Sequence, residues 1–332
     1  MRARFSRSIS ALVGVISTIA ALSIALASAA GQAPVPAKPG AYVPPRTPDG
    51  QPDFQGMWLP GGGADMQMER PSGESSPAAG AADEYAPTGG RGAAAGGRGA
   101  PAGAEGGRGR GAGAPRRTMI VDPADGKVPL QPWALARRAQ IIANQDKFDS
   151  LDPRVRCLPA GIPRVNEPIT FNTYQILQTP GHVVFLYEWS HLYRDIPLDG
   201  RPHVDPKVRL WMGDSRGHWE GNTLVVDATN FTDKQKGSNQ FAGHIVGPGH
   251  PFGNHHVTER FVPISANRIH VYSTVEDPTT WTKPWTIMIP YELQPGYQIF
   301  EYACNEGNLS VGNGLRGQRV LDAAEAAKTA NK

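Results

Sequence analysis

From about residue 155 onward, short runs of strand-forming residues alternate with tight turn signals. Turn signals such as Thr179-Pro180-Gly181 and Asp199-Gly200 separate runs that include ITFNTYQILQ, HVVFLYEW, YRDIPL, TLVVDATNF, HHVTERFVPI, RIHVYSTVED, WTIMIPYEL and YQIFEYAC. Connections this short force neighbouring strands to be antiparallel, and no long helical crossover lies between them, which excludes a parallel βαβ sheet. The sequence therefore predicts an all-β domain of roughly eight to ten strands over residues 155–320.

A sheet of strands in sequential order exposes two edges unless it closes. We therefore expect an antiparallel up-and-down meander closed into a lipocalin- or calycin-like barrel, with a β-sandwich as the second choice. The interior of a barrel of about eight strands is filled by side chains or holds one small ligand. This expectation connects the architecture to a possible function.

The N-terminal region has the pattern of a secretory signal peptide over residues 1–29. Arg2, Arg4 and Arg7 precede an apolar run that ends in the small residues Ala27-Ser28-Ala29. An uncleaved membrane anchor is the alternative, but serines and a glycine interrupt the run and a cleavage pattern follows it. The sequence thus predicts a periplasmic or secreted protein with no membrane span after cleavage.

Composition divides the rest of the chain before the β-domain into three parts. Residues 30–60 form an extended Pro-rich segment and a first strand at Gly56-Met57-Trp58. Residues 61–117 consist mainly of Gly, Ala, Pro and Arg, which predicts a disordered insertion, since such a segment buries too little apolar surface to fold. Residues 118–154 form a segment that leads into the β-domain and contains one predicted helix, from about Pro132 to Asn144. Residues 321–332 form a tail.

The number of cysteines and the net charge indicate a disulfide and give no indication of a nucleic-acid partner. Cys157 and Cys304 are the only cysteines, and in an oxidising compartment such a pair favours one disulfide over a metal or nucleophile role. The net charge is +3, which is too small to indicate a nucleic-acid partner. Arg-Gly repeats do occur in RNA-binding segments, but this insertion lacks interleaved aromatic residues, so a linker is the better interpretation.

Several long motifs resemble a widespread family of exported bacterial proteins of unknown function. The motifs are TPDGQPDFQGMW, CLPAGIPR, GDSRGHWEGNTLVVDATNF, VEDPTTWTKPW and FEYACNEGN. The resemblance covers the chain from about residue 45, apart from the Gly/Arg-rich insertion, and implies a compartment and a fold rather than an activity. Gly56-Met57-Trp58 also resembles the G-x-W opening of lipocalin-like barrels, although the insertion that follows departs from that pattern.

The sharpest cluster of candidate site residues lies in the run HHVTERF. His256, Thr258 and Arg260 share one face of a strand, while His255, Val257, Glu259 and Phe261 share the other. If the first face lines the barrel, His256 and Arg260 are placed to bind an anionic or carbonyl group; if it faces water, they are ordinary surface residues. On the next strand, Glu276 belongs to a polar face that either lines a cavity or meets solvent.

Glu188 and His191 form a second candidate pair, in LYEWSHLYRD. At a bend they would converge as a base and its partner or as two metal ligands, whereas on a regular strand they would point to opposite faces. Together with His256 they would make a His/His/Glu set for a divalent metal. The tryptophans at strand ends are either core anchors or the rim of a ligand mouth.

Other motifs indicate structure rather than chemistry. GDSRGHWEGN predicts a hairpin turn, with an Asp214–Arg216 contact holding it. P-loop, Rossmann, G-x-S-x-G and HExxH fingerprints are absent from the sequence, so a nucleotide cofactor is not expected.

Three functional hypotheses follow from these observations. The first is an acid/base or metal-assisted lyase, isomerase or hydrolase that acts on a small molecule through His256, Arg260, Glu188, His191 and Glu276. The second is a lipocalin-like protein that binds an apolar or aromatic ligand without catalysis. The third is an interaction module of the cell envelope that has no pocket.

Overall fold

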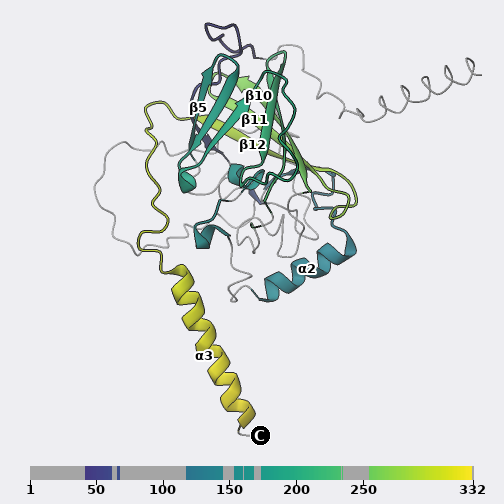
Figure 1. The fold of residues 1–332 in the computed structure, drawn as a ribbon, viewed down its shortest axis with the longest axis vertical. Helices are drawn as coiled ribbons and strands as arrows, with labels where there is room; N and C mark the ends of the chain where they lie inside the picture. Colours follow the sequence, from purple (N-terminus) through teal and green to yellow (C-terminus); the bar gives the residue numbers. More distant parts are fainter. Residues whose placement is uncertain are drawn as a thin grey trace, which may run out of the picture. The chain divides into compact units, whose positions relative to one another are not determined.

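The structure is a computed structural model that describes residues 42–61, 66–67, 117–144, 153–159, 161–167, 173–232, 234 and 254–330 (Figure 1). The predicted signal peptide and nearly all of the Gly/Arg-rich insertion lie outside these ranges. Among the helices that fall within them, none combines the length and the apolar character needed to span a membrane.

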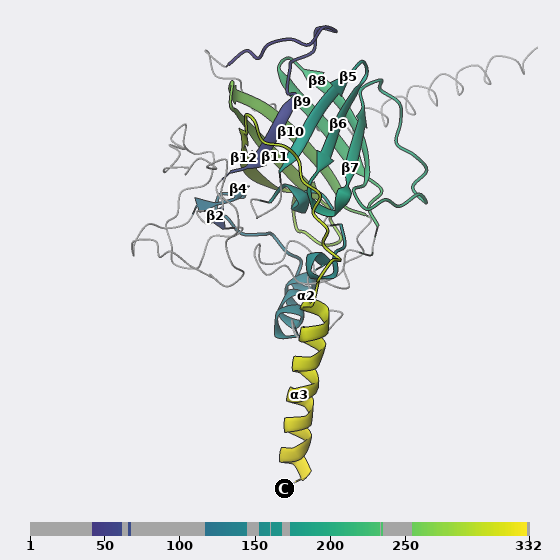
Figure 2. The same ribbon diagram turned by 90° about the vertical axis from the view of Figure 1, so that its left-hand side faces the viewer.

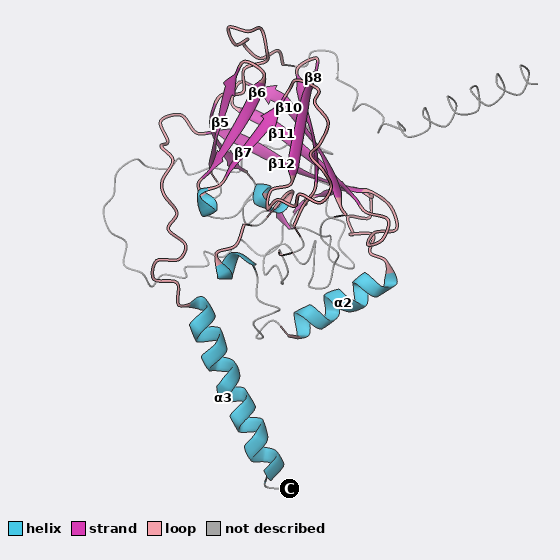
Figure 3. Cartoon of the chain, viewed as in Figure 1, coloured by secondary structure: helices cyan, strands magenta, loops and turns pink. Residues whose placement is uncertain are grey.

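Strands outnumber helices in the described chain (Figure 3), and apart from the short parallel pair of β2 and β3 they are antiparallel. The strands are β1 (Gly56–Pro60), β2 (Met66–Gln67), β3 (Arg117–Thr118), β4 (Ile120–Asp122), β5 (Tyr174–Thr179), β6 (His182–Tyr187), β7 (Tyr193–Pro197), β8 (Asp214–Glu220), β9 (Thr223–Thr229), β10 (His256–Ser265), β11 (Arg268–Glu276) and β12 (Trp285–Leu293). The helices are α2 (Pro132–Ala143), α3 (Ser310–Ala330) and the short 3₁₀ turns η3 (Pro153–Arg156), η4 (Arg164–Asn166) and η5 (Trp189–His191).

The main sheet is a nearly closed up-and-down barrel. Its hydrogen-bonded order is β7-β6-β5-β1-β12-β11-β10-β9-β8, so strands that are consecutive in this region of the sequence are neighbours in the wall, and β1 joins β5 to β12. Figure 2 shows these strands following one another around the wall, and β4 adds a short pairing to β12. The predicted all-β meander that closes into a barrel is confirmed.

Side chains close the seam between β7 and β8, the two ends of this order. The Nε of Arg194 on β7 donates to the Oγ of Ser215 on β8 over 2.8 Å. Ile196 and Leu198 approach Gly217 so closely that a Cβ there would lie 2.7 and 2.8 Å from their methyl carbons. A glycine on β8 therefore lets apolar side chains pack across the seam.

Strand alternation directs the apolar core residues into the barrel. On β10 the buried residues Val257, Glu259 and Phe261 alternate with the half-buried His256 and Arg260. The same period of two on the other strands directs one residue in two inward, as expected for a pleated wall. The inward set includes Trp58, Tyr174, Ile176, Val183, Phe185, Tyr187, Ile196, Leu224, Val226, Ala228, Val271, Ile287, Ile289 and Tyr291.

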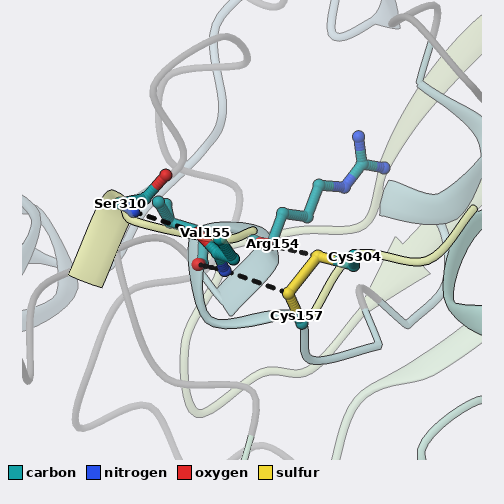
Figure 4. The surroundings of a disulfide bond; sticks show 6 residues. Arg154, Val155, Cys157, Cys304 and Ser310 are labelled. Carbon is teal, nitrogen blue, oxygen red and sulfur yellow. Dashed lines mark hydrogen bonds between the residues drawn. A yellow bond between two sulfur atoms is a disulfide. The ribbon is translucent and has the colours of Figure 1, made fainter. Parts of the chain in front are cut away.

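The predicted disulfide is confirmed. Cys157 and Cys304 are joined across a sequence separation of 147 residues, linking the segment between β4 and β5 to the segment after β12 (Figure 4). Nearby, the side-chain amide of Asn308 donates to the carbonyl oxygen of Val155 over 2.9 Å. These contacts hold the chain after the last strand against η3.

Two local predictions were wrong. GDSRGHWEGN is not a turn: β8 runs through it, and the hairpin bends at Gly221 and Asn222. YQIFEYAC is not a strand, because β12 already pairs with β1 and β11 on its two sides, and the segment instead runs irregularly past Glu188. The described part of the expected tail belongs to α3, a helix with no buried residue. The helix predicted near Pro132 is confirmed as α2.

The tryptophans divide between core and anchors. Trp281 and Trp285 are almost fully buried, with ring centroids 5.9 Å apart. Trp189 stacks on Tyr302 with centroids 4.5 Å apart, and Trp219 meets Phe54 edge-on. The interpretation as core or anchors fits these four positions.

Candidate functional site

A buried ion pair crosses the barrel interior. An Nη1–Oε2 distance of 2.5 Å joins Arg194 on β7 to Glu259 on β10, and their side chains are 2% and 0% exposed. Both residues hold inward positions of their strands, Arg194 two residues before Ile196 and Glu259 between Val257 and Phe261. Strand alternation therefore brings two opposite charges together inside an apolar wall.

Two polar side chains form hydrogen bonds with this pair. Ser215 accepts from the Arg194 Nε, and the Nδ2 of Asn166 donates to the Glu259 Oε1 over 2.7 Å. Asn166 belongs to η4, so this short helix reaches into the barrel and meets the carboxylate. Buried charges are tolerated when they are paired and hydrogen-bonded, and the four side chains together carry no net charge.

An aromatic cluster lies beside the ion pair. The Tyr174 ring centroid is 5.4 Å from that of Phe185, 5.3 Å from that of Tyr187 and 5.0 Å from that of Tyr291. Phe261 extends the cluster, with its ring centroid 5.3 Å from that of Phe185. Most of these rings meet tilted or edge-on, the arrangements that aromatic pairs prefer. We call these five residues the aromatic cluster.

The three tyrosine hydroxyls of the cluster differ in their partners. The Tyr187 hydroxyl hydrogen-bonds to Arg194, and burial raises the pKa of this phenol above its ordinary value. The hydroxyls of Tyr174 and Tyr291 are buried with no hydrogen-bond partner in the described part of the chain. Burial likewise raises the pKa of Tyr291 well above its usual range. A buried unpartnered hydroxyl is destabilising by about 1–3 kcal/mol, so native proteins keep few of them without a reason.

Sequence reasoning did not single out this interior site. It placed Glu259 on the same strand face as Val257 and Phe261, which was the available signal, because a carboxylate on an apolar face needs a buried partner. Arg194 gave a matching signal, because it shares a strand face with Ile196 in YRDIPL. The contact between them depends on the curvature that brings β7 to face β10, and single-strand patterns do not contain that information.

His256 lies on the outer face of the barrel, in a row of alternating carboxylates and imidazoles. Its Nδ1 is 2.5 Å from the Glu276 Oε1, and its Nε2 contacts the Asp227 carboxylate. The other oxygen of Asp227 lies 2.7 Å from the Nε2 of His203, whose Nδ1 is 2.8 Å from Asp214. The row thus joins the loop after β7 to strands β8, β9, β10 and β11; we call it the outer row.

The charges of the outer row shift the pKa values of His256 and Asp227. Hydrogen bonding to Asp227, opposed by burial and supported by Glu276, raises the pKa of His256 to about 9. Burial acts against ionisation of Asp227, yet its hydrogen bonds with His256 and His203 hold the pKa of this carboxyl below its usual value. At neutral pH His256 is therefore a cation that donates from both nitrogens, and it has no lone pair for a base or metal-ligand role.

The remaining predicted site residues have other partners. Glu276 contacts His256, as described, while the Nη2 of Arg260 lies 2.6 Å from the Glu220 Oε2. The predicted Asp214–Arg216 contact is present at 2.7 Å, although it lies along β8 rather than at a turn. The structure thus brings Glu276 and His256 together and leaves Arg260 in a separate pair on the same outer face.

Glu188 and His191 lie at a bend, but their side chains contact different residues. Ser190 and His191 have positive φ angles of 60° and 50°, which turns the chain sharply after β6. The buried Glu188 Oε1 accepts from the Tyr297 hydroxyl over 2.6 Å and from the Phe300 N–H over 3.1 Å.

His191 is 54% exposed in its side chain and lies 3.4 Å from Glu301. Neither Glu188 nor His191 has a contact with His256 among the interactions of the described residues. In the part of the chain that the structure describes, no group of three or more His, Cys, Asp or Glu side chains is placed to hold a metal ion.

Comparison of the chain with family models, with curated proteins and with solved structures gives no match to any of them.

Proposed function

We propose that this protein binds a small organic molecule inside its barrel, next to the aromatic cluster. The observation that carries the proposal is the pair of buried hydroxyls on Tyr174 and Tyr291, which have no hydrogen-bond partner among the described residues although their rings are in contact. Ligand sites in proteins are mostly apolar, with a few polar groups placed to orient the ligand. Two hydroxyls that lie among aromatic side chains and are unpaired in the described part of the chain fit that description.

Binding is a better proposal than acid/base catalysis at the outer row. A general base needs an available lone pair and a pKa near the working pH. His256 has neither, since its pKa is about 9 and both of its nitrogens are engaged by carboxylates. Glu188 and His191, the other expected pair, have separate partners.

A periplasmic or secreted location is part of the proposal. The Cys157–Cys304 disulfide is of the kind found in oxidising compartments. The signal-peptide pattern over residues 1–29 and the motifs that resemble exported bacterial proteins support the same location. We therefore propose that the ligand is met outside the cytoplasm.

The test uses N-phenyl-1-naphthylamine, a neutral fluorophore whose emission rises and shifts to the blue in an apolar site. We expect saturable binding at one molecule per chain. Ile176 points into the barrel beside Tyr174, and Leu177 points out of the same strand. We expect Ile176→Phe to weaken binding by about tenfold because it fills interior volume, and Leu177→Phe, the matched control, to leave binding unchanged.

Circular dichroism melting establishes that both variants fold. Emission that does not saturate, or equal effects of the two substitutions in folded protein, would contradict binding in the interior.

A further inference from the structure

From the charges and hydroxyls of the interior, we infer that the ligand is a neutral ring compound bearing a carbonyl or hydroxyl oxygen that hydrogen-bonds to Tyr174 and Tyr291. This inference rests on the proposed function and adds the chemical class of the ligand to it. It is argued in three steps, which concern the charges, the aromatic side chains and the tyrosine hydroxyls of the interior.

Among the described residues, the two charges that lie beside the aromatic cluster neutralise each other and leave none for an ionic ligand. Arg194 is the cation of the site, and it is already paired with Glu259 at 2.5 Å while its Nε donates to Ser215. Glu259 is likewise engaged, by Arg194 and by Asn166. A carboxylate or ammonium group entering this space would be buried without a counter-ion, which is costly in a low-dielectric environment. The same desolvation raises the pKa of the Tyr291 phenol and so disfavours a negative charge at this position.

The aromatic side chains around the two hydroxyls favour a ring. Tyr174, Phe185, Tyr187, Phe261 and Tyr291 present faces and edges to one another at centroid separations of 5.0–6.4 Å. Flat ligands match such surfaces because edge-to-face and offset contacts are available from several directions.

The hydroxyls of Tyr174 and Tyr291 are the reason that the ligand should carry an oxygen atom. A purely hydrocarbon ligand would leave the Tyr174 and Tyr291 hydroxyls unpartnered, as they are among the described residues. An acceptor oxygen would receive hydrogen bonds from them, and discrimination is strong when a site's buried polar groups would otherwise stay unpaired.

The experiment compares three naphthalenes of similar size by displacement of N-phenyl-1-naphthylamine at pH 7.5: 2-acetonaphthone, 2-ethylnaphthalene and 2-naphthoate. For the wild-type protein we expect the ketone to bind at least about tenfold more tightly than the carboxylate. In the double variant Tyr174→Phe/Tyr291→Phe, we expect the ketone to lose about tenfold in affinity, since two hydrogen bonds are removed, while the hydrocarbon loses none. Tyr193→Phe is the matched control, because Tyr193 is 69% exposed.

A second variant tests the charge step in the opposite direction. Glu259→Gln removes the anion that neutralises Arg194, so 2-naphthoate should gain at least about tenfold in affinity, and the ketone should not. If Glu259→Gln does not fold, the wild-type comparison of ketone and carboxylate decides the charge step.

The outcomes separate this inference from the proposed function. If the fluorophore and all three naphthalenes fail to bind, the interior-binding function is overturned. If they bind but the carboxylate is preferred, or the ketone and the hydrocarbon respond equally to the loss of both hydroxyls, only the inferred ligand class is overturned.

Discussion

At the scale of single residues, the barrel depends on two charge arrangements that differ in burial. Arg194 and Glu259 are enclosed in the interior, whereas His256 and its carboxylates lie half-exposed on the outer face. Loss of one member of the interior pair leaves a buried charge, and loss of the proton on His256 removes a cation held between two anions.

The interior pair should show strong coupling. We expect Arg194→Met to lower the free energy of unfolding by about 3–5 kcal/mol, because Glu259 is left buried without its partner. The double variant Arg194→Met/Glu259→Leu should recover most of that loss, because no charge remains to be desolvated. Urea unfolding measures both, with Arg201→Met in the exposed Asp199–Arg201 pair as control. A double variant no more stable than the single one would show that the pair is not coupled in this way.

His256 should make stability depend on pH in the alkaline range. Its pKa is raised from 6.5 to about 9, so the folded state binds more protons than the unfolded state between these values. The stabilisation from His256 is therefore complete below about pH 6.5 and is lost as the pH rises through about 9. Comparing urea unfolding of wild-type protein and His256→Gln from pH 6 to pH 10 measures this. A difference between the two proteins that stays constant over this range would contradict the argument.

At the scale of elements, the seam between β7 and β8 is the part of the wall that side chains hold together. The Arg194–Ser215 hydrogen bond and the packing of Ile196 and Leu198 on Gly217 replace the backbone ladder found between the other neighbours. His203, in the loop that joins these strands, adds contacts to Asp214 and Asp227.

A side chain at Gly217 should loosen this seam. Gly217→Ala places a Cβ 2.7 Å from Ile196 and 2.8 Å from Leu198, so the strands must separate or the side chains must move. We expect a loss of about 1–3 kcal/mol in stability and faster amide exchange in β7 and β8. Gly314→Ala is the control, since it adds a Cβ to α3 with nothing within 4 Å and should not destabilise the barrel. Unchanged exchange in Gly217→Ala would mean that the seam accommodates a methyl group.

The elements also show where sequence reasoning succeeds and where it stops. β1, β5, β6, β7 and β10 were identified because their alternation or turn signals are local. β8 was taken for a turn because its Ser215 and Gly217 resemble turn residues, whereas these small residues are required by the packing across the seam. The sequence also did not show which face of β10 lines the barrel. Its polar residues give the same pattern whether they face the interior or solvent, and the structure places His256 and Arg260 outside.

At the scale of the whole molecule, the Cys157–Cys304 disulfide ties the segment before β5 to the segment after β12. In the chain-entropy model, closing a loop of 147 residues is worth about 5 kcal/mol. We expect Cys157→Ser/Cys304→Ser to lower the free energy of unfolding by an amount of this order, and dithiothreitol to produce the same loss in the wild-type protein. Thermal or urea unfolding in both redox states measures it. An oxidised protein no more stable than the reduced one would contradict this expectation.

The overall architecture could be predicted from the sequence, whereas the contacts inside the barrel could not. Short connections dictated antiparallel neighbours, and the need to remove sheet edges dictated closure. Which strands face each other across the interior depends on how the whole wall curves, so the Arg194–Glu259 contact emerges only in three dimensions.

The position of β1 between β5 and β12 also constrains the order of assembly. Trp58 is paired with Leu293 at one side and with Tyr174 at the other. A polypeptide made from its amino end presents β1 early and β12 more than two hundred residues later. The barrel therefore cannot close while the chain is incomplete, and the ladder between β1 and β12 forms only after the carboxyl-terminal third has been added.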